Sequence, residues 1–508
     1  MGTRSVSWVG AGLFVATTCA FVACSSFGGD DPATPEPTPV PGGEDAGADT
    51  SVGGEAVAEV ELTLPKVVLV HGQTASVEVK VTRKPPFTGR FTIVATGLPK
   101  DLGVASVDVA PGASTANVTI VVGKGVPQGA LQNVKLEARN GTVTIGSAAV
   151  EGSVRGAPGE LDTTFGKDGF IDVGGDYPAL TMQADGSLYV MKALPPNDVR
   201  KYTKDGALDG TFATGGVYAP DLPFQTLVWR DQHLYLAGAL PSAGQFHVRK
   251  LDAKGALVTA YGGSGTYIRA FANTLVGAIS IGANGAAIVG GKTGTNAAFL
   301  FVNAAGMTDF YNDGFGGVEL AWQAVGAPGG FNSQVHTGTH VVAAGGKHLT
   351  KANATTHALD NSFGGNGYPT VDAFASLTSV AMDANGNFVA GGIDSTMHLV
   401  ITRTTPTGTP DLTFNGGAPL HTSVIAAVGQ GALTVSADKI IQVGTLEETG
   451  AKFHCVVARY KVDGAVDMTF GVSGRSVPAI EECYSGEVRI QPDGRILVSG
   501  SKILRLWQ

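Results

Sequence analysis

An internal repeat with a period near 50 residues constrains the fold of this chain more than any other feature of its sequence. The segment LDTTFGKDG at 161–169 returns as LDGTFATGG at 208, LDNSFGGNG at 359 and VDMTFGVSG at 466. An aromatic anchor marks each copy and its more divergent equivalents. The anchors are Phe165, Phe212, Tyr261, Phe310, Phe363, Phe414 and Phe470. Repeats of this length cannot bury an apolar face alone, so the pattern predicts an array of packed units.

A β-hairpin accompanies each anchor. Its clearest copies are QADGSLYV at 183, DANGNFVAGG at 383 and QPDGRILVSG at 491, and weaker ones begin at 230, 282, 337 and 436. An Asp-Gly or Asn-Gly pair between alternating apolar residues predicts a type I′ turn. The hairpin, the next strand and the strand after the anchor make four strands per unit. Seven such units predict a seven-bladed β-propeller over residues 158–508.

The two ends of this repeat region complement each other. It begins with the anchor motif and one strand, LDTTFGKDGFIDV, without a preceding hairpin. It ends with a hairpin and one further strand, RILVSGSKILRLWQ, without a following anchor motif. We therefore expect residues 169–173 to supply the outer strand of the last blade, closing the ring and leaving no open sheet edge.

The segments LDTTFGKDG, QPDGRILVSG and ARYKVDGAVDMTFGVSG resemble the delta-60 repeat of bacterial secreted and surface proteins. The resemblance covers essentially all of 158–508 and is clearest in the first, fifth and last copies. It implies a β-propeller and no established activity, so no catalytic residue is carried over from it.

Residues 57–155 form a separate β-rich region. About seven short alternating strands follow one another in roughly 100 residues, which is typical of a β-sandwich. The stretch VTRKPPFTGRFTIVATGLPKDLGVASVDVAPGASTANVTIVV resembles bacterial Ig-like modules of surface proteins, although the Ig-type Cys and Trp are absent. The resemblance implies a spacer or a protein-contact module.

The N-terminus is typical of an export signal. Arg4 precedes an apolar stretch, and Phe21-Val22-Ala23-Cys24 resembles a bacterial lipobox, whose cysteine would become lipidated after cleavage of 1–24. A retained signal anchor and ordinary signal-peptidase cleavage are the alternatives. Residues 25–56 are rich in Pro, Gly and acidic residues and predict a disordered linker. We expect an exported protein held by lipid at the bacterial outer membrane or cell surface.

Composition and cysteine content agree with an exported all-β protein. Charged residues make up only 15% of the chain, which contains 73 glycines. The linker holds most of the net negative charge, so the remainder is close to neutral, and no basic patch predicts nucleic-acid binding. Cys455 and Cys483 are the only cysteines of the folded region and predict a disulfide in an oxidising compartment. Two buried thiols or a metal site are the alternatives.

Two sets of residues could suggest metal binding. Asp162 and Asp168 could begin a calcium loop, but the repeat copies do not keep both carboxylates, which favours a turn in which Asp accepts backbone N–H groups. His336, His340, His348 and His357 cluster in the fourth unit. On one strand, His336 and His340 would lie about 13 Å apart, too far for one metal ion. We therefore expect no metal and no cofactor.

No nucleophile elbow or phosphate-binding glycine loop occurs in the folded region. The segments 260–274 and 445–454 are irregular and are candidate contact loops. We therefore expect a monomeric surface lipoprotein that acts as a non-catalytic binding or scaffold module for a protein or glycan. The alternative is an extracellular propeller enzyme, of lyase or hydrolase type, acting at the mouth of the central channel.

Overall fold

The computed structural model describes residues 59–174, 179–192, 197–270, 274–293, 296–307, 322–328, 330–425, 431–448, 452–480, 483 and 486–508. They belong to one compact unit, Ala56–Gln508. Its helical content in the described residues consists of four 3-10 turns, at Pro241–Ala243, Tyr261–Gly263, Phe363–Gly365 and Asn415–Gly417. None of these is long and apolar enough to cross a membrane. The expectation of an all-β chain is confirmed.

Three sheets form between residues 60 and 155. The first contains β1 (Val60–Thr63), β3 (Thr74–Arg83), β7 (Thr115–Val122) and β5 (Leu102–Val104) in that order. The second contains β10 (Val143–Ala149), β9 (Lys135–Asn140), β4 (Phe91–Thr96) and β6 (Val107–Val109), and the third β2 (Val67–Val70), β11 (Gly152–Arg155) and β8 (Gly129–Ala130). Alternate residues of β3 and β7 are buried. They share one apolar core with Ile93 and Leu136 of the second sheet, which explains the two-residue periodicity of the sequence.

Seven further sheets form between residues 170 and 506, each antiparallel. The first contains β12 (Phe170–Asp172), β38 (Lys502–Leu506), β37 (Ile496–Ser499) and β36 (Val488–Ile490). The next three are β13 (Ala179–Met182), β14 (Leu188–Met191), β15 (Val199–Tyr202) and β16 (Val217–Tyr218); β17 (Thr226–Arg230), β18 (His233–Leu240), β19 (Gln245–Asp252) and β20 (Thr266–Ala270); and β21 (Thr274–Ile281), β22 (Ala287–Thr293), β23 (Asn296–Val302) and β24 (Trp322–Pro328).

The last three sheets continue the series. They are β25 (Ser333–His336), β26 (His340–Gly345) and β27 (His348–Asn353); β28 (Ser376–Met382), β29 (Phe388–Ile393), β30 (His398–Thr404) and β31 (Leu420–Ile425); and β32 (Ala432–Ser436), β33 (Lys439–Glu448), β34 (Lys452–Lys461) and β35 (Arg475–Ser476). The predicted four strands per unit are therefore found in six sheets. The β25–β27 sheet has three, and its fourth position is reduced to the single bridge between His348 and Thr370. Pro369 lacks an N–H group there and cannot donate to a ladder.

Strand β12, the first strand of the repeat region, completes the sheet formed by the C-terminal strands β36, β37 and β38. Strand β12 pairs antiparallel with β38, with Phe170 opposite Leu504 and Asp172 opposite Lys502. The expectation that residues 169–173 would lie beside the 495–508 strands is confirmed. This pairing joins parts of the chain more than 300 residues apart and protects the edge of β38.

The hairpin turns differ from the type I′ turns expected from their Asp-Gly pairs. In QADGS the described positive φ belongs to Gly186 alone, and Ser187 donates its N–H to the carboxylate of Asp185 at 2.9 Å. Both central residues of a type I′ turn need positive φ. The divergent copy RDQH does have them, at Asp231 and Gln232. The prediction was wrong for the Asp-Gly copies because their loop is one residue longer than the two-residue turn.

The predicted disulfide is present. Cys455 in β34 is bonded to Cys483, and both residues are fully buried. The backbone N–H of Cys483 also donates to the carbonyl of Phe453 at 3.1 Å. The bridge therefore fixes the segment that leads to β36 against the β32–β35 sheet.

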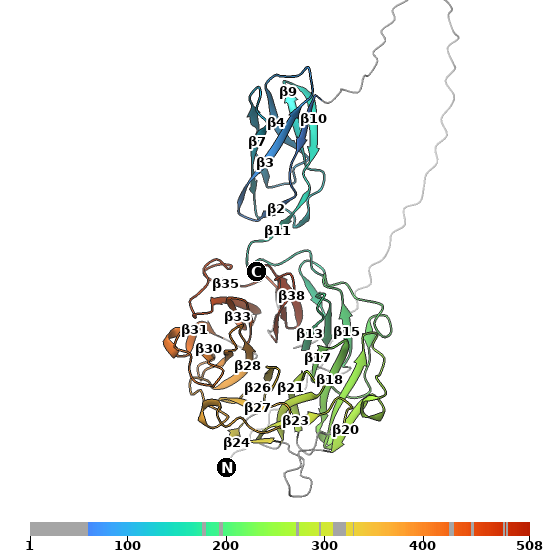
Figure 1. Ribbon diagram of the computed structural model, residues 1–508, viewed down its shortest axis with the longest axis vertical. Coiled ribbons are helices and arrows are strands. Elements are labelled where there is room, and N and C mark those ends of the chain that lie inside the picture. Colours follow the sequence, from blue (N-terminus) through green and yellow to red (C-terminus); the bar gives the residue numbers. More distant parts are fainter. Residues whose placement is uncertain are drawn as a thin grey trace, which may run out of the picture. The chain divides into compact units, whose positions relative to one another are not determined.

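The first strand of each hairpin faces a common centre (Figure 1). We call β13, β17, β21, β25, β28, β32 and β36 the inner strands. Each contacts the next in this order from β13 to β36. Between the last and the first inner strand, the N–H of Leu180 in β13 donates to the carboxylate of Glu487, the residue directly before β36.

Candidate functional site: the central channel

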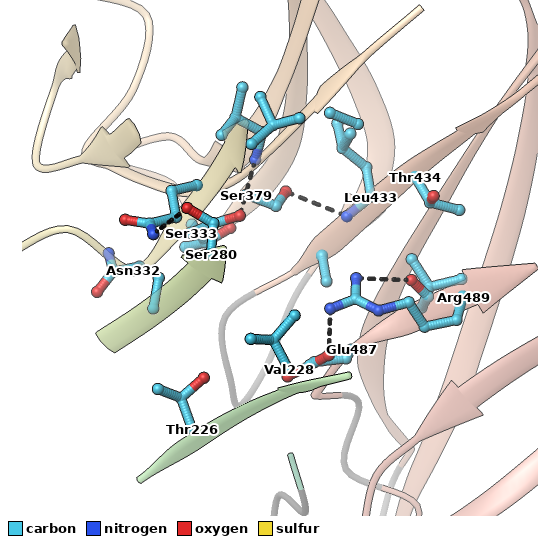
Figure 2. A pocket seen from close by; sticks show the side chains of 18 of the residues that line it. Thr226, Val228, Ser280, Asn332, Ser333, Ser379, Leu433, Thr434, Glu487 and Arg489 are labelled. Carbon is cyan, nitrogen blue, oxygen red and sulfur yellow. Dashed lines mark hydrogen bonds and ion pairs between the residues drawn. The ribbon is translucent and has the colours of Figure 1, made fainter. Parts of the chain in front are cut away.

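A cavity of about 510 Å³ occupies the centre enclosed by the inner strands. All seven inner strands, or the residues directly before them, contribute to its lining. Figure 2 shows side chains from several of these strands pointing toward the same space. A cavity of this volume can hold a small molecule.

Two rings of side chains form the middle of this wall, and strand pairing defines them. In each hairpin, the upper ring takes one residue of the inner strand. It is the residue that pairs with the second apolar residue of the neighbouring strand in the same hairpin. These are Thr181, Val228, Ser280, Val335, Ala381, Thr434 and Arg489. The lower ring lies two residues earlier in the chain, at Ala179, Thr226, Ala278, Ser333, Ser379, Ala432 and Glu487. All of these except Ala179 line the cavity. Both rings are small and uncharged except at the seventh position, where Glu487 and Arg489 stand.

Glu487 and Arg489 form an ion pair in the wall of the cavity. Nη2 of Arg489 lies 2.8 Å from Oε2 of Glu487, and their side chains are 46% and 31% exposed, respectively. Figure 2 shows the two side chains side by side at the edge of the cavity. Burial raises the pKa of the Glu487 carboxyl above its ordinary value, although Arg489 opposes the shift. Both residues line the cavity and their side chains are partly exposed there, whereas Oε2 of Glu487 itself is buried.

The hydroxyl groups of the wall mostly join one sheet to the next. Oγ of Ser379 accepts the backbone N–H of Leu433 at 3.1 Å, and Oγ of Ser333 accepts that of Val380 at 3.2 Å (Figure 2). Oγ1 of Thr181 accepts the N–H of Trp229 in the same way. These bonds satisfy the hydroxyl oxygens and hold neighbouring inner strands in register.

His336 lies at the end of β25, where it also lines the cavity. Its Nδ1 accepts the N–H of Gly338 at 3.0 Å, so its neutral ring carries the proton on Nε2. Burial lowers the pKa of His336, and the charges of Arg230 and His340 act in the same direction. His336 is therefore a neutral hydrogen-bond donor near neutral pH.

The four histidines considered from the sequence do not form one site. The premise that His336 and His340 share a strand was wrong, because a turn at 337–339 places them on β25 and β26. His348 contacts Thr370, and the buried His357 stacks on Phe301 with ring centroids 4.1 Å apart. Among the described residues, no group of three or more His, Cys, Asp or Glu side chains could hold a metal ion.

The motif aspartates serve turns and ion pairs, as the sequence comparison favoured. Oδ1 of Asp162 accepts the N–H and the hydroxyl of Thr164, while Oδ2 lies 2.8 Å from Nε of Arg505. The guanidinium of Arg505 in turn lies 4.6 Å from the ring centre of Phe165. Related aspartate–cation pairs occur at Asp209–Lys201, Asp360–Lys351, Asp411–Arg403 and Asp467–Arg459.

The aromatic anchors are buried between sheets. Six of them, all except Phe310, are at most 1% exposed. Phe212 packs against Tyr189 of its own sheet, and both belong to an apolar cluster that includes Leu236 of the following sheet. Phe310 lies outside the described residues, as does the predicted lipidation site Cys24. The candidate contact loops include strand residues, since 260–274 contains β20 and 445–454 contains the end of β33 and the start of β34.

Glu487 and Arg489 were missed by the sequence analysis. They lie in the unremarkable stretch EVRI, which resembles an ordinary exposed strand. Aligning the seven hairpins by position would have singled them out, because the other six copies have no charge at either position. Such an alignment requires knowing which strand of each hairpin is the inner one, and the pairing register of the hairpins shows this.

Comparison with known proteins gives no family for this chain. No family model matches it, and no curated protein matches it. Among solved structures, the PQQ-bound aldose sugar dehydrogenase of Streptomyces coelicolor is 12% identical, with a TM-score of 0.36, and the match covers 59% of this chain and 98% of that one. A GH43 endo-arabinanase from Bacillus licheniformis is 11% identical, with a TM-score of 0.24 and coverage of 67% and 94%. A DUF4784 family protein from Bacteroides caccae is 10% identical, with a TM-score of 0.24, and the match covers 83% of this chain and 99% of that one. Such weak likeness transfers no activity to this chain.

Proposed function

We propose that this chain is an exported lipoprotein of the bacterial envelope, in which an Ig-like sandwich precedes a seven-bladed propeller of the delta-60 type. The seven sheets around one cavity and the pairing of β12 with β38 support the propeller. The lipobox-like sequence before Cys24 and the disulfide support export. The test of anchoring is incorporation of labelled fatty acid in cells, which Cys24→Ser should abolish; full labelling of that variant would reject the lipid site.

The biochemical role that we propose is binding, without chemical change, of an envelope ligand in the central channel. The observation that carries this proposal is a cavity of about 510 Å³ walled by all seven inner strands. The hydroxyl groups of Ser333 and Ser379 are engaged between sheets and the acid of the wall is paired with a base, so the wall offers recognition more readily than an activated nucleophile.

Affinity capture from envelope extracts tests this role. The immobilised chain should enrich a ligand, and Ala381→Trp, which fills the cavity from the upper ring, should remove that enrichment. Ala465→Trp is the matched control, since Ala465 lies in an exposed turn. Failure of the original chain to enrich anything, or equal enrichment by the Ala381→Trp variant, would reject channel binding.

A hydrolase- or lyase-type enzyme is the second candidate. The raised pKa of Glu487 favours it, because the carboxyl groups that act as general acids are shifted in this direction by burial. Glycoside hydrolysis usually needs a second carboxylate, whereas Glu487 is the single carboxylate among the described lining residues. Turnover of a chromogenic glycoside or ester that Glu487→Gln abolishes would establish this candidate over simple binding.

A further inference from the structure

The ion pair of Glu487 and Arg489 is not required by the fold. The six other inner strands carry only Ala, Ser, Thr or Val at the two corresponding positions. Those strands make the same hairpins and line the same cavity. A charged pair inside a protein costs desolvation free energy that uncharged residues avoid, so its presence in one copy calls for a reason other than packing.

The two charges are arranged to accept a further partner. Nη2 of Arg489 is engaged by Glu487, and within the described part of the chain its Nη1 makes only a long contact of 3.4 Å with the carbonyl of Val488. The guanidinium has five N–H groups, which leaves donors for a carboxylate. The carboxylate of Glu487, which also accepts the N–H of Leu180, keeps lone pairs for an ammonium group.

The charge balance of the wall selects the class of ligand. Among the described lining residues, Glu487, Arg489 and His336 are the ionisable ones, and His336 is neutral. A purely anionic or cationic ligand would therefore leave one charge of the wall uncompensated, which is costly at a buried site. A zwitterion carries a charge complementary to each of the two residues, so the net charge of the cavity with its ligand stays at zero. The described lining also lacks Trp, Tyr and Phe, on which a sugar ring would stack.

We propose that the channel binds a zwitterionic amino acid or short peptide, whose ammonium contacts Glu487 and whose carboxylate contacts Arg489. This inference rests on the proposed binding function and specifies its ligand. Thr434 on the upper ring and Thr226 on the lower ring line the same cavity (Figure 2). In the proposed complex their hydroxyl groups contact the polar parts of the ligand.

Calorimetric titration of the full chain with individual L-amino acids and dipeptides tests the proposal. At least one of them should bind, while its N-acetyl derivative, which lacks the ammonium, and its amide, which lacks the carboxylate, should each bind about tenfold more weakly or less. Absence of binding across the panel, or equal affinity for the blocked derivatives, would overturn it. A neutral disaccharide that binds while the zwitterions do not would overturn it as well.

Variants locate the site. Glu487→Ser with Arg489→Ala gives β36 the residues that β28 carries at these positions, Ser379 and Ala381, so the double variant should fold and lose zwitterion binding. The matched control is the pair Glu137 and Arg139 on β9, which has the same spacing and a separation of 2.7 Å outside the channel. Glu137→Ser with Arg139→Ala should leave binding unchanged, and equal loss in both double variants would refute the assignment.

The inference and the proposed function fail in different ways. If envelope extracts yield a channel ligand that the Ala381→Trp variant cannot bind, but no zwitterion binds, only the ligand class is wrong. If Ala381→Trp has no effect on any ligand, channel binding itself is wrong.

Discussion

At the residue scale, the recurring unit of this molecule is an aspartate, a cation and an aromatic ring. The aspartate organises the turn through Oδ1 and pairs with the cation through Oδ2, as Asp467 does with Thr469 and Arg459. The guanidinium of Arg459 lies 4.7 Å from the ring centre of Phe470. Each group therefore positions the next, which explains why the three residue types recur together along the chain.

The third and fourth copies show that this unit is optional. Val258 replaces the aspartate in the third copy and Met307 replaces it in the fourth. Tyr261 of the third copy stays buried nonetheless. The apolar anchor therefore contributes to the packing of every described copy, whereas the ion pair stabilises only some of them.

We predict that Asp209→Asn destabilises the protein by about 1 to 2 kcal/mol near pH 7. Hydrogen bonds from Thr211 and Lys201 lower the pKa of Asp209 from 3.8 to about 2, so the folded state favours the carboxylate. This contribution is present above pH 4 and is lost as the pH falls toward 2. Urea unfolding should show a smaller difference in the free energy of unfolding between the original protein and Asp209→Asn at pH 3 than at pH 7. Glu151→Gln, in an exposed pair with Lys66, should change stability by less than about 0.5 kcal/mol.

At the element scale, the aromatic anchors join neighbouring sheets. Phe212 is fully buried against residues of two sheets. Replacing it with Ala should cost about 3 to 5 kcal/mol, because a cavity remains where the ring was. Denaturant unfolding measures this, and Met468→Ala, at a residue that is 66% exposed, is the control. A negligible loss for Phe212→Ala would show that the sheets do not depend on the anchor.

The disulfide stabilises a different element, the segment that connects β35 with β36. Cys455 and Cys483 are 28 residues apart in sequence. Closing such a loop should stabilise the protein by about 3 to 4 kcal/mol. The double variant Cys455→Ala and Cys483→Ala should lower the free energy of unfolding by that amount. If the segment also positions Glu487, the double variant should lose zwitterion binding as well. Unchanged stability would indicate that other contacts hold the loop.

At the scale of the whole molecule, the start and the end of the repeat region are held together by side chains as well as by strand pairing. Arg505 is fully buried and bonds Asp162, while Oδ2 of Asp162 also contacts Arg495. These residues join the first anchor motif to the C-terminal hairpin. The ring of sheets therefore has a defined seam, which a mutation can weaken without touching any other sheet.

We predict that Arg505→Gln costs about 3 to 5 kcal/mol, because it leaves a buried carboxylate with incomplete compensation. Hydrogen exchange should show β12 and β38 losing protection before the inner strands of the other sheets. Arg200→Gln, which removes a partly exposed pair with the sequence neighbour Asp198, should cost far less. Uniform loss of protection throughout the molecule would show that the seam is not a separate point of weakness.

Sequence alone predicted most of the strands, the closing strand and the disulfide partners. Each follows from local chemistry: alternating burial, turn residues, a period near 50 and a pair of cysteines. The turn type of the Asp-Gly hairpins was predicted wrongly, because one extra loop residue changes which positions take positive φ.

Only the tertiary structure decided where the functional groups lie. In the sequence, Glu487 and Arg489 look like any charged pair on a strand. Their place in the wall of a common cavity results from the packing of seven inner strands around it. The identical Glu–x–Arg pattern at Glu137 and Arg139 lies outside the channel. Burial and the neighbours supplied by other sheets set the pKa, the accessibility and the unused hydrogen-bonding capacity of a charged pair, and none of these is encoded in its own strand.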